Sequence, residues 1–176
     1  MAELDLLVRL KVPDTVAASA RFALVELLGH TNLSALDREE LWRFTGAFDP
    51  EKLLPELLRR TSRFVNPSKH AHRRVDSLAG LTPPRDDGGT PVGVLVSKRD
   101  DFAGRDALAY CRNTLGLTEI EGARYSTLWT LWLTGGDPAD SARRMADCSA
   151  RTPGLLANPH CEVWELIAFQ NLRMIR

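Results

Sequence analysis

The chain has 176 residues, of which 44% are apolar and 26% charged, and its 23 basic and 23 acidic side chains give a formal net charge of zero. This length suits one domain or two small ones, and the composition suits a folded core rather than a disordered chain. Zero net charge gives no global attraction to nucleic acid or to an anionic membrane, so we expect neither as a partner.

No apolar run approaches the length of a membrane span, and residues 1–5 lack the basic region and apolar core of a signal peptide. The three cysteines, Cys111, Cys148 and Cys161, are odd in number and have no CxxC spacing. This usage favours free thiols in a reducing compartment over disulfides. We therefore expect a cytoplasmic protein.

The first half begins with an apolar alternation over residues 4–12, which predicts a strand. Asp14 is a good N-cap and Gly29 a good C-terminal stop, so a helix is predicted between them. A strand-rich stretch then ends at Gly46 and is interpreted as two strands.

A second helix is predicted to begin at Asp49-Pro50, because an aspartate N-cap followed by proline is a favourable helix start. Pro55 lies inside this helix, where it should cost one hydrogen bond and kink or restart the helix. Asn66-Pro67 is expected to break the helix, and residues 71–75 are predicted to form the last strand.

The second half repeats these landmarks in the same order. Residues 92–96 predict a strand, and Asp101 and Gly116 bound a helix with the same spacing as Asp14 and Gly29. The landmarks that follow are a strand-rich stretch ending at Gly135, a helix start at Asp137-Pro138, a break at Asn158-Pro159 and a strand over residues 162–168.

Two copies of this order predict an α+β protein made of two tandem ferredoxin-like βαββαβ units, each with an antiparallel sheet and helices on one face. The first unit spans residues 1–78 and the second, with a C-terminal tail, spans 92–176. Residues 79–91 are rich in proline and glycine and are interpreted as a linker.

The strands of the second unit are apolar on both sides, which indicates that both faces of its sheet are covered. Trp129 and Leu131 lie on one side of the central strand, and Leu128 and Trp132 lie on the other. We expect the two sheets to cover each other face to face, as a pseudo-dimer in one chain. Edge pairing of the sheets and burial against another protein are the alternatives.

Residues 155–165 read Leu-Leu-Ala-Asn-Pro-His-Cys-Glu-Val-Trp-Glu, and this segment resembles the end of PurS, the small subunit of phosphoribosylformylglycinamidine (FGAM) synthase. The resemblance covers residues 92–168 and includes Lys98, Gly104-Arg105 and Leu115-Gly116. The first copy is similar more loosely, with Lys11, Leu28-Gly29 and Asn66-Pro67, and it has Phe64-Val65 in place of Leu-Ala.

The resemblance implies a non-catalytic assembly subunit, or a paralogue of one, in de novo purine biosynthesis. Its partners would be the large ATP-dependent synthetase subunit and the glutaminase subunit, between which ammonia passes. It implies no catalytic residue, no cofactor and no metal ligand in this chain. The alternative is a small-molecule-binding regulatory module of the ferredoxin-like (ACT-like) type. A neutral surface and the apolar tail 169–175 would also permit a homodimer.

Three groups of residues invite a chemical interpretation. His70 and His72 would share one face of a strand, but their basic surroundings oppose cation binding, so an exposed basic strand is expected. His160 and Cys161 are adjacent and would point to opposite faces of a strand, which argues against a nucleophile beside a base. Gly88-Gly89 lacks the context of a phosphate-binding loop and is interpreted as a turn.

A basic stretch between residues 59 and 74 is the remaining candidate. It could contact nucleic acid or phosphate, or face a partner protein, and the zero net charge favours a solvated or protein-facing surface. Its members are Arg59, Arg60, Arg63, Lys69, Arg73 and Arg74.

Overall fold

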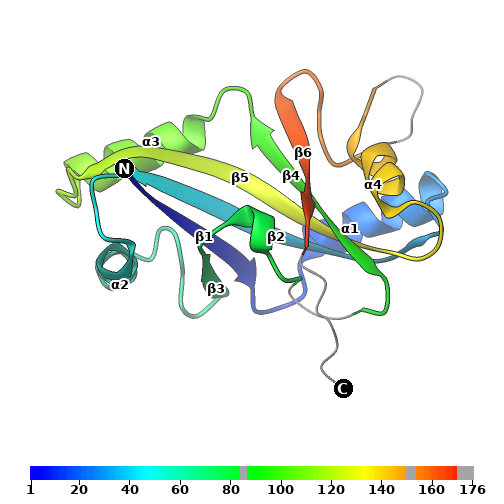
Figure 1. The fold of residues 1–176 in the computed structure, drawn as a ribbon, viewed down its shortest axis with the longest axis horizontal. Coiled ribbons are helices and arrows are strands. Elements are labelled where there is room, and N and C mark those ends of the chain that lie inside the picture. The colour runs from blue at the N-terminus through cyan, green and yellow to red at the C-terminus, as the bar shows by residue number, and fades with distance from the viewer. Residues whose placement is uncertain (84–86, 150–153, 170–176) are drawn as a thin grey trace. The chain divides into compact units, whose positions relative to one another are not determined.

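The structure is a computed structural model that describes residues 1–83, 87–149 and 154–169. It is an α+β fold in which the described residues form four α-helices and one open antiparallel sheet of six strands, in the order β3-β1-β2-β5-β4-β6 (Figure 1). Residues 84–86 of the expected linker and 170–175 of the expected apolar tail lie outside the described residues.

The order strand, helix, strand, helix, strand occurs twice along the chain. The first half contains β1 (Ala2–Leu10), α1 (Thr15–Phe22) with its π-helical continuation η1 (Ala23–Leu27), β2 (Leu33–Gly46), α2 (Pro50–Arg60) and β3 (His70–Val75). The second half contains the 3-10 turn η2 (Leu78–Gly80), β4 (Thr90–Lys98), α3 (Phe102–Asn113), β5 (Ile120–Leu133), α4 (Pro138–Ala146) and β6 (Glu162–Ala168). The strands β1 and β4 have nine residues each, and β2 and β5 have 14 each.

The predicted helix starts are confirmed, because an aspartate side chain accepts backbone N–H groups at each of them. The four N-caps are Asp14, Asp49, Asp101 and Asp137. The glycine stops are confirmed too, since Gly29 and Gly116 have φ values of +77° and +67°, which favour glycine. Pro55 does not end α2, which continues to Arg60.

The predicted pair of strands in the middle of each half is wrong. One strand of 14 residues, β2 or β5, occupies each stretch. The physical reason is the absence of a turn signal, because no Gly or Pro occurs between Leu33 and Thr45, and only Gly122 occurs inside β5. An uninterrupted run of strand-forming residues therefore stays extended.

The chain forms two compact units, which we call unit 1 and unit 2. Unit 1 comprises residues 1–12, 39–76 and 100–127, and unit 2 comprises residues 13–38, 77–99 and 128 onward. Each long strand gives one part to each unit, so α1 belongs to unit 2 and α3 belongs to unit 1. The compact units therefore do not follow the order of the two copies along the sequence.

The favoured arrangement of two separate sheets is also wrong, because all six strands belong to one sheet in which β2 neighbours β5. Edge pairing, the alternative, is the arrangement observed. It satisfies the backbone groups of two strands that would otherwise be edges.

Unit 1 has a core on the helix side of its strands, where β1, β2, α2 and α3 meet. Aromatic rings lie at its centre: Phe64 contacts Trp42 and Phe44 edge to face, with ring centroids 5.2 Å apart in both pairs. The buried residues include Leu4, Leu6, Val8, Leu53, Leu57, Ala107, Cys111 and Ile120.

Unit 2 has its own core, formed by α1, η1, α4 and the strands beside them. Its buried residues include Leu24, Val94, Val96, Trp129, Leu131, Leu133, Met145 and Leu156. Burial on both sides of β5 is confirmed, since Leu128 and Trp132, on the opposite side from Trp129 and Leu131, are also buried. The expected linker contributes to this burial, because η2 contacts β6 and Leu81 is only 2% exposed.

Candidate functional site

His70 and His72 lie on β3, as expected, and share one side of that strand. His70 Nδ1 accepts a hydrogen bond from the Asn66 backbone N–H at 3.2 Å, so this nitrogen is already used within the fold. In the part of the chain that the structure describes, no group of three or more His, Cys, Asp or Glu residues could hold a metal ion.

His160 and Cys161 are not strand residues, because β6 begins at Glu162. They lie in the turn before it, and both are exposed. The expectation that they lie on opposite faces of a strand is therefore wrong, because neither residue belongs to a strand. The backbone carbonyl of Cys161 instead accepts a hydrogen bond from the backbone N–H of Arg99 at 2.9 Å.

Most of the basic stretch is neutralised inside unit 1. Arg60 pairs with Glu56, Arg63 with Asp106, Arg73 with Glu39, and Arg74 with Glu51 and Asp76. Arg63 also lies over the Tyr110 ring, 4.6 Å from its centroid. This pairing leaves few of the six cations available as a continuous basic surface.

A shared feature of the two copies is a turn built on Asn-Pro. The Asn66 side chain accepts the Ser68 N–H at 3.0 Å, and the Asn158 side chain accepts the His160 N–H at 3.0 Å. Each asparagine carbonyl also accepts two backbone N–H groups at the start of the following strand, β3 or β6. Proline holds the preceding asparagine in an extended conformation, so the same sequence pair makes the same turn twice.

Strand register shows which basic residues correspond beside these turns. The backbone N–H of Lys11 donates to Lys69 O, and in the second copy the backbone N–H of Arg99 donates to Cys161 O. By strand register Lys11 therefore corresponds to Arg99 and not to Lys98. The two lysines still reach the turns, because Lys11 Nζ donates to Pro67 O and Lys98 Nζ to Glu162, each at 2.6 Å.

The Glu162 carboxylate accepts hydrogen bonds from both Asn158 and Lys98 at the second turn. Burial alone would raise the pKa of Glu162, but the Asn158 N–H and the Lys98 ammonium group stabilise its charged form, and the pKa falls below its ordinary value. The Asn158 N–H lies 2.7 Å from Oε2. These contacts are structural, since they use the carboxylate oxygens within the fold.

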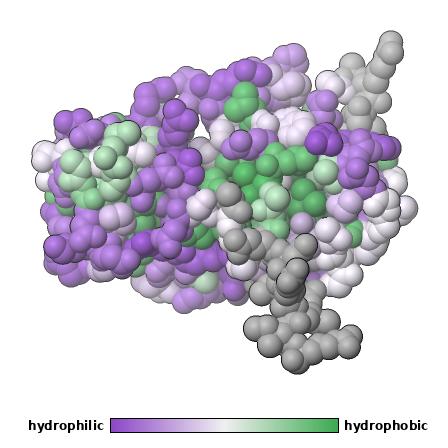
Figure 2. All heavy atoms as spheres, in the orientation of Figure 1, coloured by the Kyte–Doolittle hydropathy of each residue, from purple (hydrophilic) through white to green (hydrophobic). Residues whose placement is uncertain are grey.

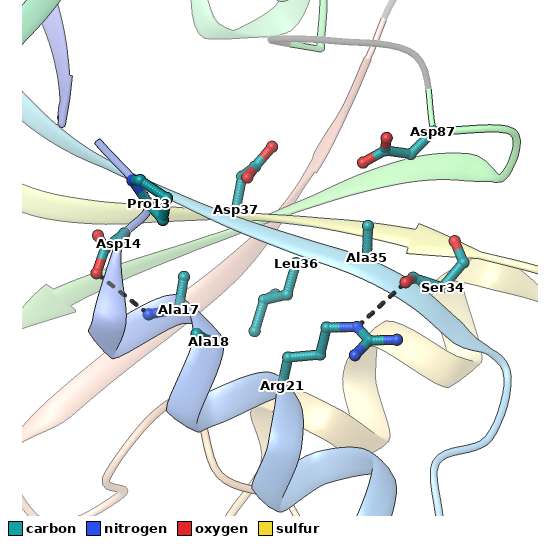
Figure 3. A pocket seen from close by; sticks show the side chains of 10 residues that line it. All are labelled: Pro13, Asp14, Ala17, Ala18, Arg21, Ser34, Ala35, Leu36, Asp37 and Asp87. Atoms are coloured by element: carbon teal, nitrogen blue, oxygen red, sulfur yellow. Dashed lines mark hydrogen bonds between the residues drawn. The ribbon is translucent and has the colours of Figure 1, made fainter. Parts of the chain in front are cut away.

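A pocket of about 520 Å³ lies in unit 2 between α1 and the first part of β2 (Figure 3). Arg21 crosses one end of it and donates from Nε to Ser34 O at 3.1 Å. Its volume is in the range of small-molecule sites. The pocket is lined by Pro13, Asp14, Ala17, Ala18, Arg21, Ser34, Ala35, Leu36, Asp37 and Asp87.

Comparison with unit 1 gives a reason for the pocket. Gly104 is three residues after the N-cap of α3, as Ala17 is in α1. A Cβ on Gly104 would lie 2.5 Å from Ala123 O, so α3 sits directly against β5. The N-cap Asp101 adds a hydrogen bond from Tyr125 N–H at 2.9 Å.

In unit 2, Asp14 contacts the Arg38 guanidinium group at 3.6 Å, and Ala17 carries the Cβ that Gly104 lacks. The helix therefore cannot approach the strand as closely, and space remains between them. The sequence contained this signal as a Gly-to-Ala difference at matched positions, but only the contact at Gly104 shows what it does.

No protein-family model matches the chain, and no curated protein matches it either.

Proposed function

We propose that the protein is a PurS-like assembly subunit of FGAM synthase, or a paralogue of one, with two tandem copies in a single chain that replace a dimer. In this proposal residues 1–78 and 92–176 are the copies and 79–91 the linker. It would act in the cytoplasm, joining the synthetase and glutaminase subunits for ammonia transfer, and would have no catalytic activity alone.

The observation that carries the proposal is the Asn-Pro turn built twice at the same place in a twice-repeated order of elements. In the second copy Leu156 and Ala157 are buried, and Asn158 then makes the turn into β6. In the first copy Phe64 and Val65 are buried before Asn66. The Leu-Leu-Ala-Asn-Pro resemblance thus falls on residues with a clear packing role.

Co-elution tests this function. The chain would be mixed with the purified synthetase and glutaminase subunits of the same organism, with and without glutamine, and separated by size. We expect one complex containing all three, and activity of the mixture that depends on the chain. Separate elution under both conditions would rule out the assembly role.

None of the helices within the described residues is long and apolar enough to cross a membrane.

The pocket in unit 2 favours a second candidate, a small-molecule-binding regulatory module. Thermal unfolding in the presence of amino acids or purine nucleotides tests it, since a ligand at 100 times its dissociation constant adds about 2.7 kcal/mol to the stability of the folded state. Ala18 is exposed and lines the pocket, so Ala18→Leu should abolish the shift. Ser19→Leu, on the same helix but outside the lining, is the matched control.

A further inference from the structure

One face of the sheet in unit 1 carries no helix and is rich in arginine. Along β1 the core residues Leu4, Leu6 and Val8 face the helices, so Asp5, Leu7 and Arg9 face the other side. We call that side the open face of unit 1 because neither α2 nor α3 packs on it, although Asp5 and Leu7 are themselves buried there. Strand pairing adds Arg43, opposite Asp5, and Arg73, opposite Leu7.

Two carboxylates are buried beneath two of these arginines. Arg43 binds Asp5 through Nε and Nη2 at 2.7 and 2.6 Å, and Arg73 binds Glu39 through Nη2 at 2.7 Å and Nε at 3.3 Å. Asp5 and Glu39 are only 2% and 3% exposed, whereas the Arg43 and Arg73 side chains are 31% and 29% exposed. Arg43 also lies 3.5 Å from Glu3, a half-exposed carboxylate on the same side of β1. A partner would therefore meet guanidinium groups that are already held in place.

Two further arginines belong to the same face. Arg124 lies between Ala123 and Tyr125, which pack on the helix side, so its own side chain lies on the open face. Arg9 and Arg124 are both exposed, and neither is ion-paired with another described residue. Figure 2 shows hydrophilic side chains over the region of β1 and β3 in the same view.

Unit 2 shows that the fold does not require these charges. Its strands β4 and β6 correspond to β1 and β3, and by register Gly93, Ser97 and Glu165 stand where unit 1 has Asp5, Arg9 and Arg73. Arg9 and Arg73 are thus replaced in unit 2 by Ser97 and Glu165, neither of which is basic.

A helix-free face of an antiparallel sheet is often polar simply because it meets water. Three features go beyond this: the cations are all arginine, two of them are fixed by nearly buried carboxylates, and two more beside them have no acidic partner among the described residues. Arginine is the residue preferred for binding carboxylates at interfaces, and a fixed side chain loses less entropy on binding.

We propose that the open face of unit 1 docks onto an acidic surface of a partner protein, with Arg9 and Arg124 forming its new ion pairs. The inference rests on the proposed assembly role only for the identity of that partner, which would be the synthetase or the glutaminase subunit. The surface chemistry itself is a property of this chain.

The test uses Arg9→Glu/Arg124→Glu as the docking variant. Arg59→Glu/Arg112→Glu is the matched control, because it makes the same charge change at exposed arginines on α2 and α3. In the co-elution experiment we expect the control to bind the partners like the natural chain and the docking variant to bind at least about tenfold more weakly, or about 1.4 kcal/mol. Equal binding by both variants would overturn the docking face while leaving the assembly role intact.

A peptide-binding experiment tests the docking face even if the natural chain binds neither subunit. A fluorescent peptide of alternating Glu and Ala should bind the natural chain and the control variant, with affinity that falls as salt rises, and should bind the docking variant at least about tenfold more weakly. Equal binding to all three proteins would overturn the proposal. A preference for a single-stranded oligonucleotide of the same length would also overturn it, in favour of a nucleic-acid surface.

Discussion

The helix-free sides of the two units are built on matching strand positions but carry opposite chemistry. In unit 1 Asp5 and Arg43 face each other across β1 and β2 as an ion pair in which the carboxylate is buried and the guanidinium group is partly exposed. In unit 2 the position of Asp5 is taken by Gly93, which approaches Ile167 and Leu128 so closely that a Cβ would lie 2.9 Å from the Ile167 Cβ. Figure 2 shows an apolar area over the region of β4 and β6.

The same strand arrangement therefore accommodates either an ion pair or apolar side chains on this side of the sheet. An apolar face is stabilised by the area removed from water, whereas a buried ion pair must first overcome the cost of desolvating two charges. The ion pairs of unit 1 are therefore not the most stabilising choice for this sheet. The docking proposed above would give them a second role.

Breaking one of these ion pairs should destabilise the protein more than any other change considered. Arg43→Leu leaves Asp5, 2% exposed, without its bidentate partner, and should lower the free energy of unfolding by about 3–5 kcal/mol. Asp5→Leu should cost less, because Arg43 remains about one-third exposed and can be hydrated. Urea unfolding measures both.

Removing both charges separates the effect of the ion pair from the effect of an unpaired buried carboxylate. Asp5→Leu/Arg43→Leu gives unit 1 an apolar pair like those of unit 2, and should recover most of the stability lost in Arg43→Leu, since no buried charge is left. If Arg43→Leu alone proved as stable as the natural chain, the buried Asp5 carboxylate would not depend on Arg43 as its partner.

The thiols give the next contrast, between the core of unit 1 and the surface of unit 2. Burial raises the pKa of Cys111 to about 11, against a smaller lowering by Arg63, so at pH 8 only about one molecule in a thousand carries the thiolate. Cys161 is exposed. Alkylation at pH 8 should therefore modify Cys161 at least about 100-fold faster than Cys111.

Cys148 should fall between the two. Burial raises its pKa as well, with help from Asp147 and Glu162, and its Sγ lies 3.2 Å from Gly154 O. Mass spectrometry of peptides after timed alkylation gives all three rates in one experiment, with urea-unfolded protein as the control. Similar rates for Cys111 and Cys161 in the native state would contradict the buried core of unit 1.

The two helix–strand contacts give a third test. Gly104→Ala places a Cβ 2.5 Å from Ala123 O and must push α3 away from β5, at a cost of about 1–3 kcal/mol. The Tyr125 amide, which donates to Asp101, should then exchange with solvent more quickly. Ala17→Gly, the reverse change in unit 2, should cost only about 1 kcal/mol, the ordinary penalty for glycine in a helix. Equal losses in the two variants would show that the closeness of α3 to β5 does not matter.

The features predicted correctly from the sequence are local ones. Asp14, Asp101 and Gly116 each act within one turn of the chain, so their residue type is enough to place a helix start or stop. The Asn-Pro turns are local for the same reason. The contributions of β2 and β5 to both units, and the membership of α1 in unit 2, depend on contacts between distant segments, which periodicity does not encode.

The charged open face was missed for a related reason. The residues that form it are spread over four strands, from Asp5 to Arg124, and each looks like an ordinary surface charge in its own segment. Arg73 belongs to the basic stretch between residues 59 and 74, yet its partner Glu39 lies 34 residues away in the chain. Only strand register brings Arg73 to Glu39 and Arg43 to Asp5. The pocket likewise depends on how closely α1 approaches β2.

Changes at the Asn-Pro turns should alter stability least, and here the two copies use different chemistry. The Asn158 N–H donates to Glu162, whereas the Asn66 N–H donates to His70. Because the Asn158 N–H and Lys98 hold the pKa of Glu162 below its ordinary value in the folded state, this carboxylate contributes stability that is fully present above its unfolded pKa of about 4.5. The contribution is lost as pH falls from there through the lower folded pKa.

Glu162→Gln removes this titration, so the fall in the urea midpoint between pH 5 and pH 3 should be smaller in the variant than in the natural chain. Many other carboxylates also titrate in this range, and the difference between the two proteins isolates Glu162. Glu165→Gln on the same strand, a carboxylate without those two contacts, is the control and should follow the natural chain. If the urea midpoint of Glu162→Gln fell as much as that of the natural chain, the second turn would not depend on the charge of Glu162. The two Asn-Pro turns would then be equivalent in energy as well as in shape.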